Sequence, residues 1–246
     1  MHLFDTELFN QRLFYPRPDH TPPGPTVVDH FVEVPGARIH LRQHTTPGAT
    51  PVLHFNGNGE VVADYDKAAP KFARAGAELW VADYRGYGLS TGVPTLRNFI
   101  SDSRLVAAHL GRPFVVFGRS LGSAGAAELM GLASPQLRGV VIDSGASDFT
   151  GLIRRREMEV PDTFSPEIRA VFDPLPKMKR GTAPLLVMHG LNDAVIHHRE
   201  ATLAFETAGT PASQKTLCLI EGHGHNDVGT SPKYWEALRA FLLAHH

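Results

Sequence analysis

The sequence predicts an α/β protein built on a mostly parallel sheet with helices on both faces. Short apolar runs rich in β-branched and aromatic residues, typical of buried strands, alternate with longer segments of helical pattern. Glycine- and proline-containing turns separate the two kinds of segment. Counting the apolar runs gives about eight strands, and the alternation of strands with helices predicts helices on both sides of one sheet.

Composition limits the class of protein. The 246 residues, 42% hydrophobic and 20% charged, suit a single domain spanning 1–246. A formal net charge of −1 argues against an electrostatic nucleic-acid binder. The single cysteine, Cys218, permits no internal disulfide and no cysteine-based metal or redox motif. It lies in an apolar run, which indicates a buried small hydrophobe.

The N-terminal residues contain no basic region followed by an apolar stretch, so no signal peptide is expected. No run of about 18 apolar residues predicts a transmembrane helix. A cytoplasmic protein is the resulting expectation.

Residues 1–26 are rich in proline and are expected to form an irregular surface arm. Its apolar side chains are expected to pack on the domain, with binding of a lipid or a partner as the alternative. These side chains are Leu8, Phe9, Leu13, Phe14 and Tyr15.

The remaining elements follow from local pattern. Pro35-Gly36 joins the first two strands as a hairpin, so an antiparallel pair is expected at one edge of the sheet. The expected strands are 27–34, 37–43, 51–55, 77–82, 113–117, 138–143, 184–189 and 215–220. The expected helices are 61–75, irregular at its start because of Pro70, and then 96–110, 123–130, 199–208 and 232–244.

Residues 149–182 interrupt this alternation. A charged segment contains Arg154, Arg155, Arg156, Glu157 and Glu159, and Pro161, Pro166, Pro174 and Pro176 follow. We expect a short, mostly helical cap or lid insert, because structureless loops of this length are uncommon and usually have a role. A long connecting loop is the alternative.

The turn Gly118-Arg119-Ser120-Leu121-Gly122 is the strongest functional signal. It lies between a buried strand and a small-residue helix, the context that makes a Gly-x-Ser-x-Gly pattern a nucleophile elbow. A second match, Gly88–Gly92 with Ser90 at its centre, lies beyond its strand and is followed by Val93-Pro94. We therefore interpret the second match as a loop and Ser120 as the nucleophile.

A serine nucleophile needs a base and an acid, which in a parallel sheet gather at the carboxyl ends of strands in the chain order Ser, Asp, His. Asp193 follows the strand 184–189 and is the expected acid, with Asp143 and Asp148 as competitors. The loop after the last strand offers His223 and His225 as bases, and position alone leaves both open. The remaining histidines, including His189, are expected to be structural or exposed, with no spacing typical of a metal site.

Acyl transfer also needs two N–H donors for the oxyanion. The backbone N–H of Leu121, directly after the nucleophile, is one expected donor. The loop Asn56-Gly57-Asn58-Gly59 follows the third strand, and its glycines permit close approach of the backbone to a substrate. We assign the second donor to the backbone of Asn58.

Taken together, these segments resemble the α/β-hydrolases, in the branch of small ABHD-type serine hydrolases. The matching segments are His54–Gly59, Asp83–Gly88, the Ser120 turn, Gly224-His225-Asn226-Asp227 and, before the domain, Leu13–Pro16. The resemblance implies the α/β-hydrolase fold, selects His225 as the base, and makes Arg85 and Tyr87 scaffold residues. Members often have His-Gly where this chain has Asn56-Gly57, a departure that affects how the loop is held.

The expected activity is hydrolysis of a small-molecule carboxylic ester or thioester through an acyl-enzyme, with no cofactor and no metal. A peptidase or amidase on the same triad, or a non-catalytic binding member of the fold, are the alternatives. Haloalkane dehalogenases and epoxide hydrolases are disfavoured because those relatives use Asp as the nucleophile.

Overall fold

The computed structural model describes residues 3–147, 149–155, 157–159 and 164–246. Its centre is one eight-stranded sheet. The strands are β1 (Val27–Val34), β2 (Ala37–His44), β3 (Thr50–Phe55), β4 (Ala77–Ala82), β5 (Phe114–Arg119), β6 (Leu137–Asp143), β7 (Leu185–Gly190) and β8 (Lys215–Ile220). Each expected strand is present. Three of them match the expected range, and the ends of the other five differ by one or two residues.

Helices connect the strands. The α-helices are α1 (Glu7–Leu13), α2 (Ala69–Ala75), α3 (Leu96–His109), α4 (Ser123–Leu132), α5 (Phe149–Arg154), α6 (Pro166–Phe172), α7 (Pro174–Arg180), α8 (Arg199–Thr207) and α9 (Pro232–Ala244). Short 3₁₀ helices are η1 (Leu3–Asp5), η2 (Val62–Tyr65), η3 (Ser120–Gly122), η4 (Ala212–Gln214) and η5 (Val228–Thr230). Among the described helices, none is both long and apolar enough to cross a membrane.

The strand order is β1-β2-β4-β3-β5-β6-β7-β8. β1 pairs antiparallel with β2 and β2 pairs antiparallel with β4, whereas all later pairs are parallel. The expected antiparallel edge is therefore confirmed. Parallel strands direct their carboxyl ends to one edge of the sheet, so the loops after β3, β5, β7 and β8 meet there.

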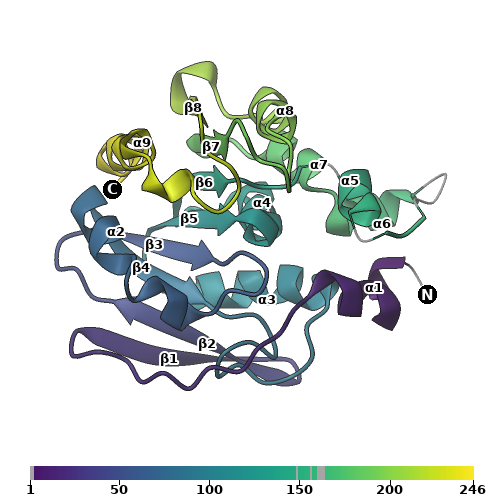
Figure 1. The fold of residues 1–246 in the computed structure, drawn as a ribbon, viewed down its shortest axis with the longest axis horizontal. Helices are drawn as coiled ribbons and strands as arrows, with labels where there is room; N and C mark the ends of the chain where they lie inside the picture. The colour runs from purple at the N-terminus through teal and green to yellow at the C-terminus, as the bar shows by residue number, and fades with distance from the viewer. Residues whose placement is uncertain (1–2, 148, 156, 160–163) are drawn as a thin grey trace.

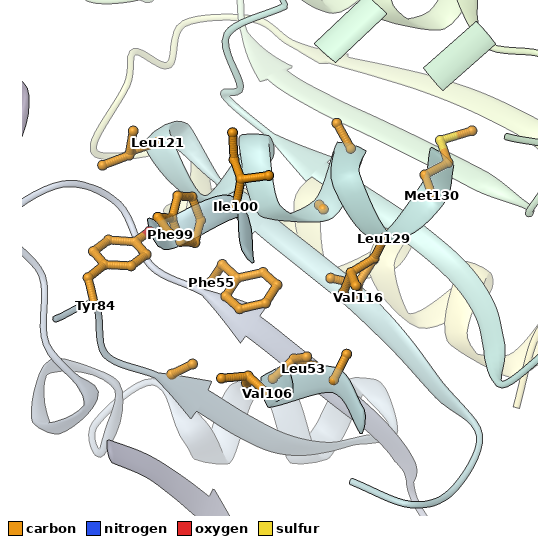
Figure 2. Close-up of a cluster of buried hydrophobic side chains, with 14 of the residues drawn as sticks. Leu53, Phe55, Tyr84, Phe99, Ile100, Val106, Val116, Leu121, Leu129 and Met130 are labelled. Atoms are coloured by element: carbon orange, nitrogen blue, oxygen red, sulfur yellow. The ribbon is translucent and has the colours of Figure 1, made fainter. Parts of the chain in front are cut away.

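Successive residues of a strand point to opposite faces of the sheet, and both faces are buried. In β5, Val116 packs on one side with α3 and α4, and Val115 and Phe117 pack on the other with α2 and α9. Figure 2 shows side chains of α3 and α4 facing those of β3 and β5. Cys218 belongs to the second cluster and is buried.

The expectation of an irregular N-terminal arm is wrong for residues 3–13. Thr6 caps α1 by accepting a hydrogen bond from the Phe9 N–H, and no proline occurs before Pro16. The helix buries Phe9 and Leu13, so packing on the domain is the observed outcome. The preceding turn places Phe4 against Phe172 of α6, with ring centroids 4.8 Å apart.

Two other regions refine the expectations. The segment 61–75 forms two pieces, η2 and α2, and Pro70 lies in the first turn of α2, where its missing N–H is tolerated. The described part of 149–182 is largely helical, as α5, α6 and α7, and Figure 1 places α6 near the N-terminal helices, in agreement with the contact of Phe4 and Phe172. Arg156 and Pro161 lie outside the described residues.

Candidate active site

Ser120 lies at the junction of β5 and the helix that follows. Its φ of 50° is left-handed, a conformation that costs a non-glycine residue free energy and that turns the chain sharply. The 3₁₀ turn Ser120–Gly122 leads directly into α4, and the Ser123 hydroxyl donates to the Ser120 carbonyl at 2.6 Å. Strand, sharp turn and helix therefore follow in the order that the sequence predicts for an elbow.

Close backbone packing requires the two flanking glycines. A Cβ on Gly122 would lie 2.1 Å from the carbonyl oxygen of Phe55, the last residue of β3. A Cβ on Gly118 would lie 2.6 Å from the carbonyl oxygen of Gly122. The turn thus packs directly against the end of β3, which brings the Ser120 hydroxyl close to the loop 56–59.

His225 connects Ser120 to Asp193. Its Nε2 lies 3.0 Å from Ser120 Oγ and its Nδ1 lies 2.7 Å from Asp193 Oδ2. An ionised carboxylate can only accept, so the hydrogen-bond network assigns the proton to Nδ1 and leaves Nε2 to accept from the serine hydroxyl. The structure thus brings together the three side chains that the sequence singles out.

Asp193 is buried and is held at both oxygens. Oδ1 accepts from the N–H groups of Val195 and Ile196, each at 2.8 Å, and Oδ2 faces the two histidines His225 and His189. Burial by itself raises the pKa of Asp193, but the hydrogen bonds from His189, His225 and Ile196 outweigh burial. The pKa is therefore well below its ordinary value, and Asp193 is ionised near neutral pH.

His189, at the end of β7, is the residue of this group that sequence reasoning missed. Its Nε2 lies 3.0 Å from Asp193 Oδ2 and 2.8 Å from the Ile196 carbonyl oxygen. Both neighbours accept, so Nε2 carries a proton. Burial lowers the pKa of His189, but its partners Asp193 and Ile196 give a net raised value. The only sequence signal was its spacing of four residues from Asp193.

The competing candidates have other partners. Asp143 is buried and accepts from the hydroxyls of Tyr234, at 3.0 Å, and Ser144, at 2.9 Å. The ring of His223 bonds the Glu221 carbonyl oxygen at 2.7 Å. Asp148 lies outside the described residues.

A cavity of about 80 Å³ opens over Ser120. Asn58 and Leu121, the expected oxyanion donors, lie in its wall. The N-terminal segment and Tyr87 together fix the Asn58 side chain. Its amide donates to the Leu13 carbonyl, and its Oδ1 accepts from the Tyr15 N–H at 3.2 Å and the Tyr87 hydroxyl at 2.8 Å. The other lining residues are Leu96, Ser123, Ala124, Ala146, Leu152, Arg155, Phe172, Pro174, Val195 and Ile196.

Within the described residues, no group of three or more His, Cys, Asp or Glu side chains has an arrangement that could hold a metal ion.

The model of the family described as serine aminopeptidase, S33, matches residues 49–171, half of the chain. The chain belongs to the α/β-hydrolases. The matched region includes Ser120 and the loop 56–59 and ends before Asp193 and His225.

Named relatives agree with this assignment. The human alpha/beta hydrolase domain-containing protein 17B is 29% identical over 69% of this chain and 58% of its own length. The Caenorhabditis elegans alpha/beta hydrolase domain-containing protein aho-3 is 30% identical over 65% of this chain and 47% of its own length. The chain thus spans about half the length of these relatives.

Solved structures show the same fold. An esterase from Pyrococcus furiosus superposes with a TM-score of 0.70 at 16% identity, covering 89% of this α/β-hydrolase and 92% of that chain. An esterase from a Rhodococcus species gives a TM-score of 0.70 at 17% identity, covering 90% and 100%. At these identities the likeness concerns the fold alone.

Proposed function

We propose that the protein is a serine hydrolase that cleaves a carboxylic ester or thioester through an acyl-enzyme. The observation that carries this proposal is the continuous hydrogen-bonded chain from Ser120 Oγ through the His225 ring to Asp193, at a cavity. A serine hydroxyl is a weak nucleophile until a positioned base removes its proton, and this arrangement supplies the base and the group that orients it.

In the first half-reaction, Ser120 Oγ bonds to the acyl carbon while its proton passes to His225 Nε2. Ionised Asp193 stabilises the resulting imidazolium. The backbone N–H groups of Asn58 and Leu121 hold the negative oxygen of the tetrahedral intermediate. His225 then protonates the departing alcohol or thiol. In the second half-reaction, His225 Nε2 removes a proton from water while the water oxygen bonds to the acyl carbon. The imidazolium then returns this proton to Ser120 Oγ as the bond from Oγ to the acyl carbon breaks and the carboxylic acid leaves.

We infer from the size of the cavity that the acyl group of the substrate is short. Its volume of about 80 Å³ is smaller than the ~150 Å³ of an apolar cavity that accommodates benzene. Most of its wall is apolar, and Leu152, Phe172 and Pro174 come from the insert 149–182. We therefore assign the insert to a cap over the acyl site, within the single domain.

The experiment compares two serines. Ser120→Ala is expected to lower turnover of p-nitrophenyl butyrate by about 10⁴-fold or more and to abolish labelling by a fluorophosphonate probe. Ser90→Ala, at the second Gly-x-Ser-x-Gly match, is the matched control and is expected to keep both. Unchanged labelling of the Ser120→Ala variant would refute the assignment.

Two series of substrates test the length of the acyl group and the type of bond that is cleaved. Turnover is expected to be faster for acetyl and butyryl esters than for octanoyl and longer esters, because the cavity holds few carbons. The description of the matched family makes amide hydrolysis the competing activity. Faster turnover of p-nitroanilides than of matched p-nitrophenyl esters would favour the amidase.

A further inference from the structure

Arg119 occupies the position directly before the serine in the Gly-x-Ser-x-Gly turn. Its side chain joins two loops that flank Ser120. One loop is Asn56–Glu60, after β3, and the other is Glu221–Asp227, after β8. Nη1 pairs with Glu60 Oε1, and Nη2 donates to the carbonyl oxygen of His225 and to Asn226 Oδ1, each at 3.1 Å. A single guanidinium thus touches both loops.

Glu60 extends this contact to the backbone of its own loop. Its Oε2 accepts from the Gly57 N–H at 2.7 Å and from the Tyr65 hydroxyl at 2.7 Å, while Oε1 faces Arg119. Gly57 leaves the space that this arrangement needs, since a Cβ there would lie 2.4 Å from Arg119 Nη1. The chain Gly57–Glu60–Arg119–His225 is therefore continuous.

The ion pair between Arg119 and Glu60 is largely shielded from water. The side chain of Arg119 is 15% exposed and that of Glu60 is 27% exposed, so water screens the pair only partly. Burial lowers the pKa of Arg119, but attraction to Glu60 and Asp143 gives a net raised value. A planar guanidinium can serve separate acceptors at fixed angles, which the single ammonium of lysine cannot reproduce.

The side chain of Arg119 lies in a hollow of about 240 Å³ that it shares with Glu60, Tyr65 and Asn226. That hollow is separate from the acyl cavity lined by Asn58 and Ser120. Arg119 does not line the acyl cavity, so an effect of Arg119 on the reaction would run through the two loops rather than through contact with the acyl group.

We propose that Arg119 is a positioning residue: paired with Glu60, it fixes the loop that carries the catalytic histidine relative to the loop that carries the oxyanion donor. This inference rests on the proposed function, in which His225 is the base and the backbone of Asn58 is a donor. A displacement of catalytic groups by about 1 Å can cost about 10²-fold in rate.

The test compares Arg119→Lys with Arg85→Lys. Arg85 is a matched control, because it is 10% exposed and makes a two-pronged ion pair with Asp102 of α3, a residue of neither loop. For Arg119→Lys we expect kcat on p-nitrophenyl butyrate to fall about tenfold or more, with KM within about twofold. For Arg85→Lys we expect wild-type kcat.

Titration with a fluorophosphonate separates positioning from loss of folded protein. Arg119→Lys is expected to be labelled to full stoichiometry but more slowly than wild type, and Glu60→Gln is expected to behave in the same way. The double variant Glu60→Gln/Arg119→Lys is expected to be little slower than the worse single variant, because both changes break one bridge.

A kcat of Arg119→Lys that equals wild type, or that falls only in proportion to the titrated fraction, would overturn the inference while Ser120→Ala remains inactive. A wild-type chain that neither turns over esters nor is labelled would overturn the proposed function and, with it, this inference.

Discussion

The two Gly-x-Ser-x-Gly turns of this chain place their serines in opposite situations. Ser120 has a left-handed backbone, borders a cavity and meets a histidine ring nitrogen at 3.0 Å. Ser90 is buried, and its Oγ accepts from the backbone N–H of His40 at 2.8 Å. One serine can deliver a proton to a base, whereas the other completes the hydrogen bonding of a strand.

The second turn even has a histidine and carboxylates nearby. The ring of His40 lies 3.1 Å from Asp83 through Nδ1 and 3.1 Å from Asp29 through Nε2, so both ring nitrogens face acids. Serine, histidine and aspartate thus gather twice in this fold. The difference teaches that the direction of the histidine ring and the access of the serine, rather than the residue types, distinguish the candidate site.

Replacement of the two histidines gives the largest expected contrast. His225→Gln is expected to lower kcat/KM on p-nitrophenyl butyrate by about 10³-fold or more, because the serine loses its base. His40→Gln is expected to leave kcat near wild type and to reduce the free energy of unfolding by about 1–3 kcal/mol, because buried carboxylates lose a donor. Steady-state kinetics and urea unfolding measure the two effects, and a comparable loss of kcat in both variants would remove the contrast.

The next largest contrast is in the stability lost when the last glycine of each turn, Gly122 or Gly92, is replaced. Gly122→Ala places a Cβ 2.1 Å from a backbone oxygen of β3, so a strand end must move, and we expect a loss of about 3 kcal/mol in the free energy of unfolding. In Gly92→Ala the new Cβ lies 2.9 Å from the Cβ of Ala37, and the φ of 81° is unfavourable for alanine. We expect this variant to lose about 1–2 kcal/mol in the free energy of unfolding. Urea unfolding of both variants is the measurement, and equal losses would contradict the close packing of the Ser120 turn.

The smallest expected contrast is in the pH dependence of stability that Asp193 and Asp83 contribute. Burial dominates at Asp83 and raises its pKa, whereas hydrogen bonds outweigh burial at Asp193 and lower its pKa. Ionised Asp193 stabilises the fold above its ordinary pKa of 3.8, and this stability is lost as the pH falls through the folded value. The contribution of Asp83 is present below 3.8 and is lost as the pH rises through its raised value.

Unfolding of wild type, Asp193→Asn and Asp83→Asn between pH 3 and 6 checks these signs. As the pH rises, the stability of wild type relative to Asp193→Asn is expected to increase and its stability relative to Asp83→Asn to decrease. Each slope is at most one proton, about 1.4 kcal/mol per pH unit. Slopes of the same sign would show that the two acids occupy similar environments.

Much of the fold could be predicted because its signals are local. Apolar runs of strand length and the Pro35-Gly36 hairpin are visible in a window of ten residues. All eight strands of the sheet were therefore predicted from local sequence. Helix α1 was not predicted because the proline-rich composition of residues 1–26 as a whole conceals that the prolines begin only at Pro16, after the helix that Thr6 caps. The helix is held by distant contacts, since its Asn10 side chain accepts from the Leu96 N–H, 86 residues away.

The candidate site divides in the same way. Ser120, Asp193 and His225 each follow a predicted strand, so topology alone groups them, and their catalytic roles stay predictions. His189 lies only four residues from its partner Asp193, a weak local signal, whereas Arg119 gave no local signal of its partners. The partners of Arg119 lie 59 and 106 residues away, and only a folded chain brings such groups together.

The hydrogen bonds at Ser120 have a consequence for the kinetics of folding. The contact of Ser120 with His225 spans 105 residues, and that of Asn58 with the carbonyl oxygen of Leu13 spans 45. Contacts of such long sequence separation require slow loop closure and form after local helices. Recovery of activity after dilution from denaturant would therefore report the arrival of the final native contacts, later than the recovery of far-ultraviolet circular dichroism.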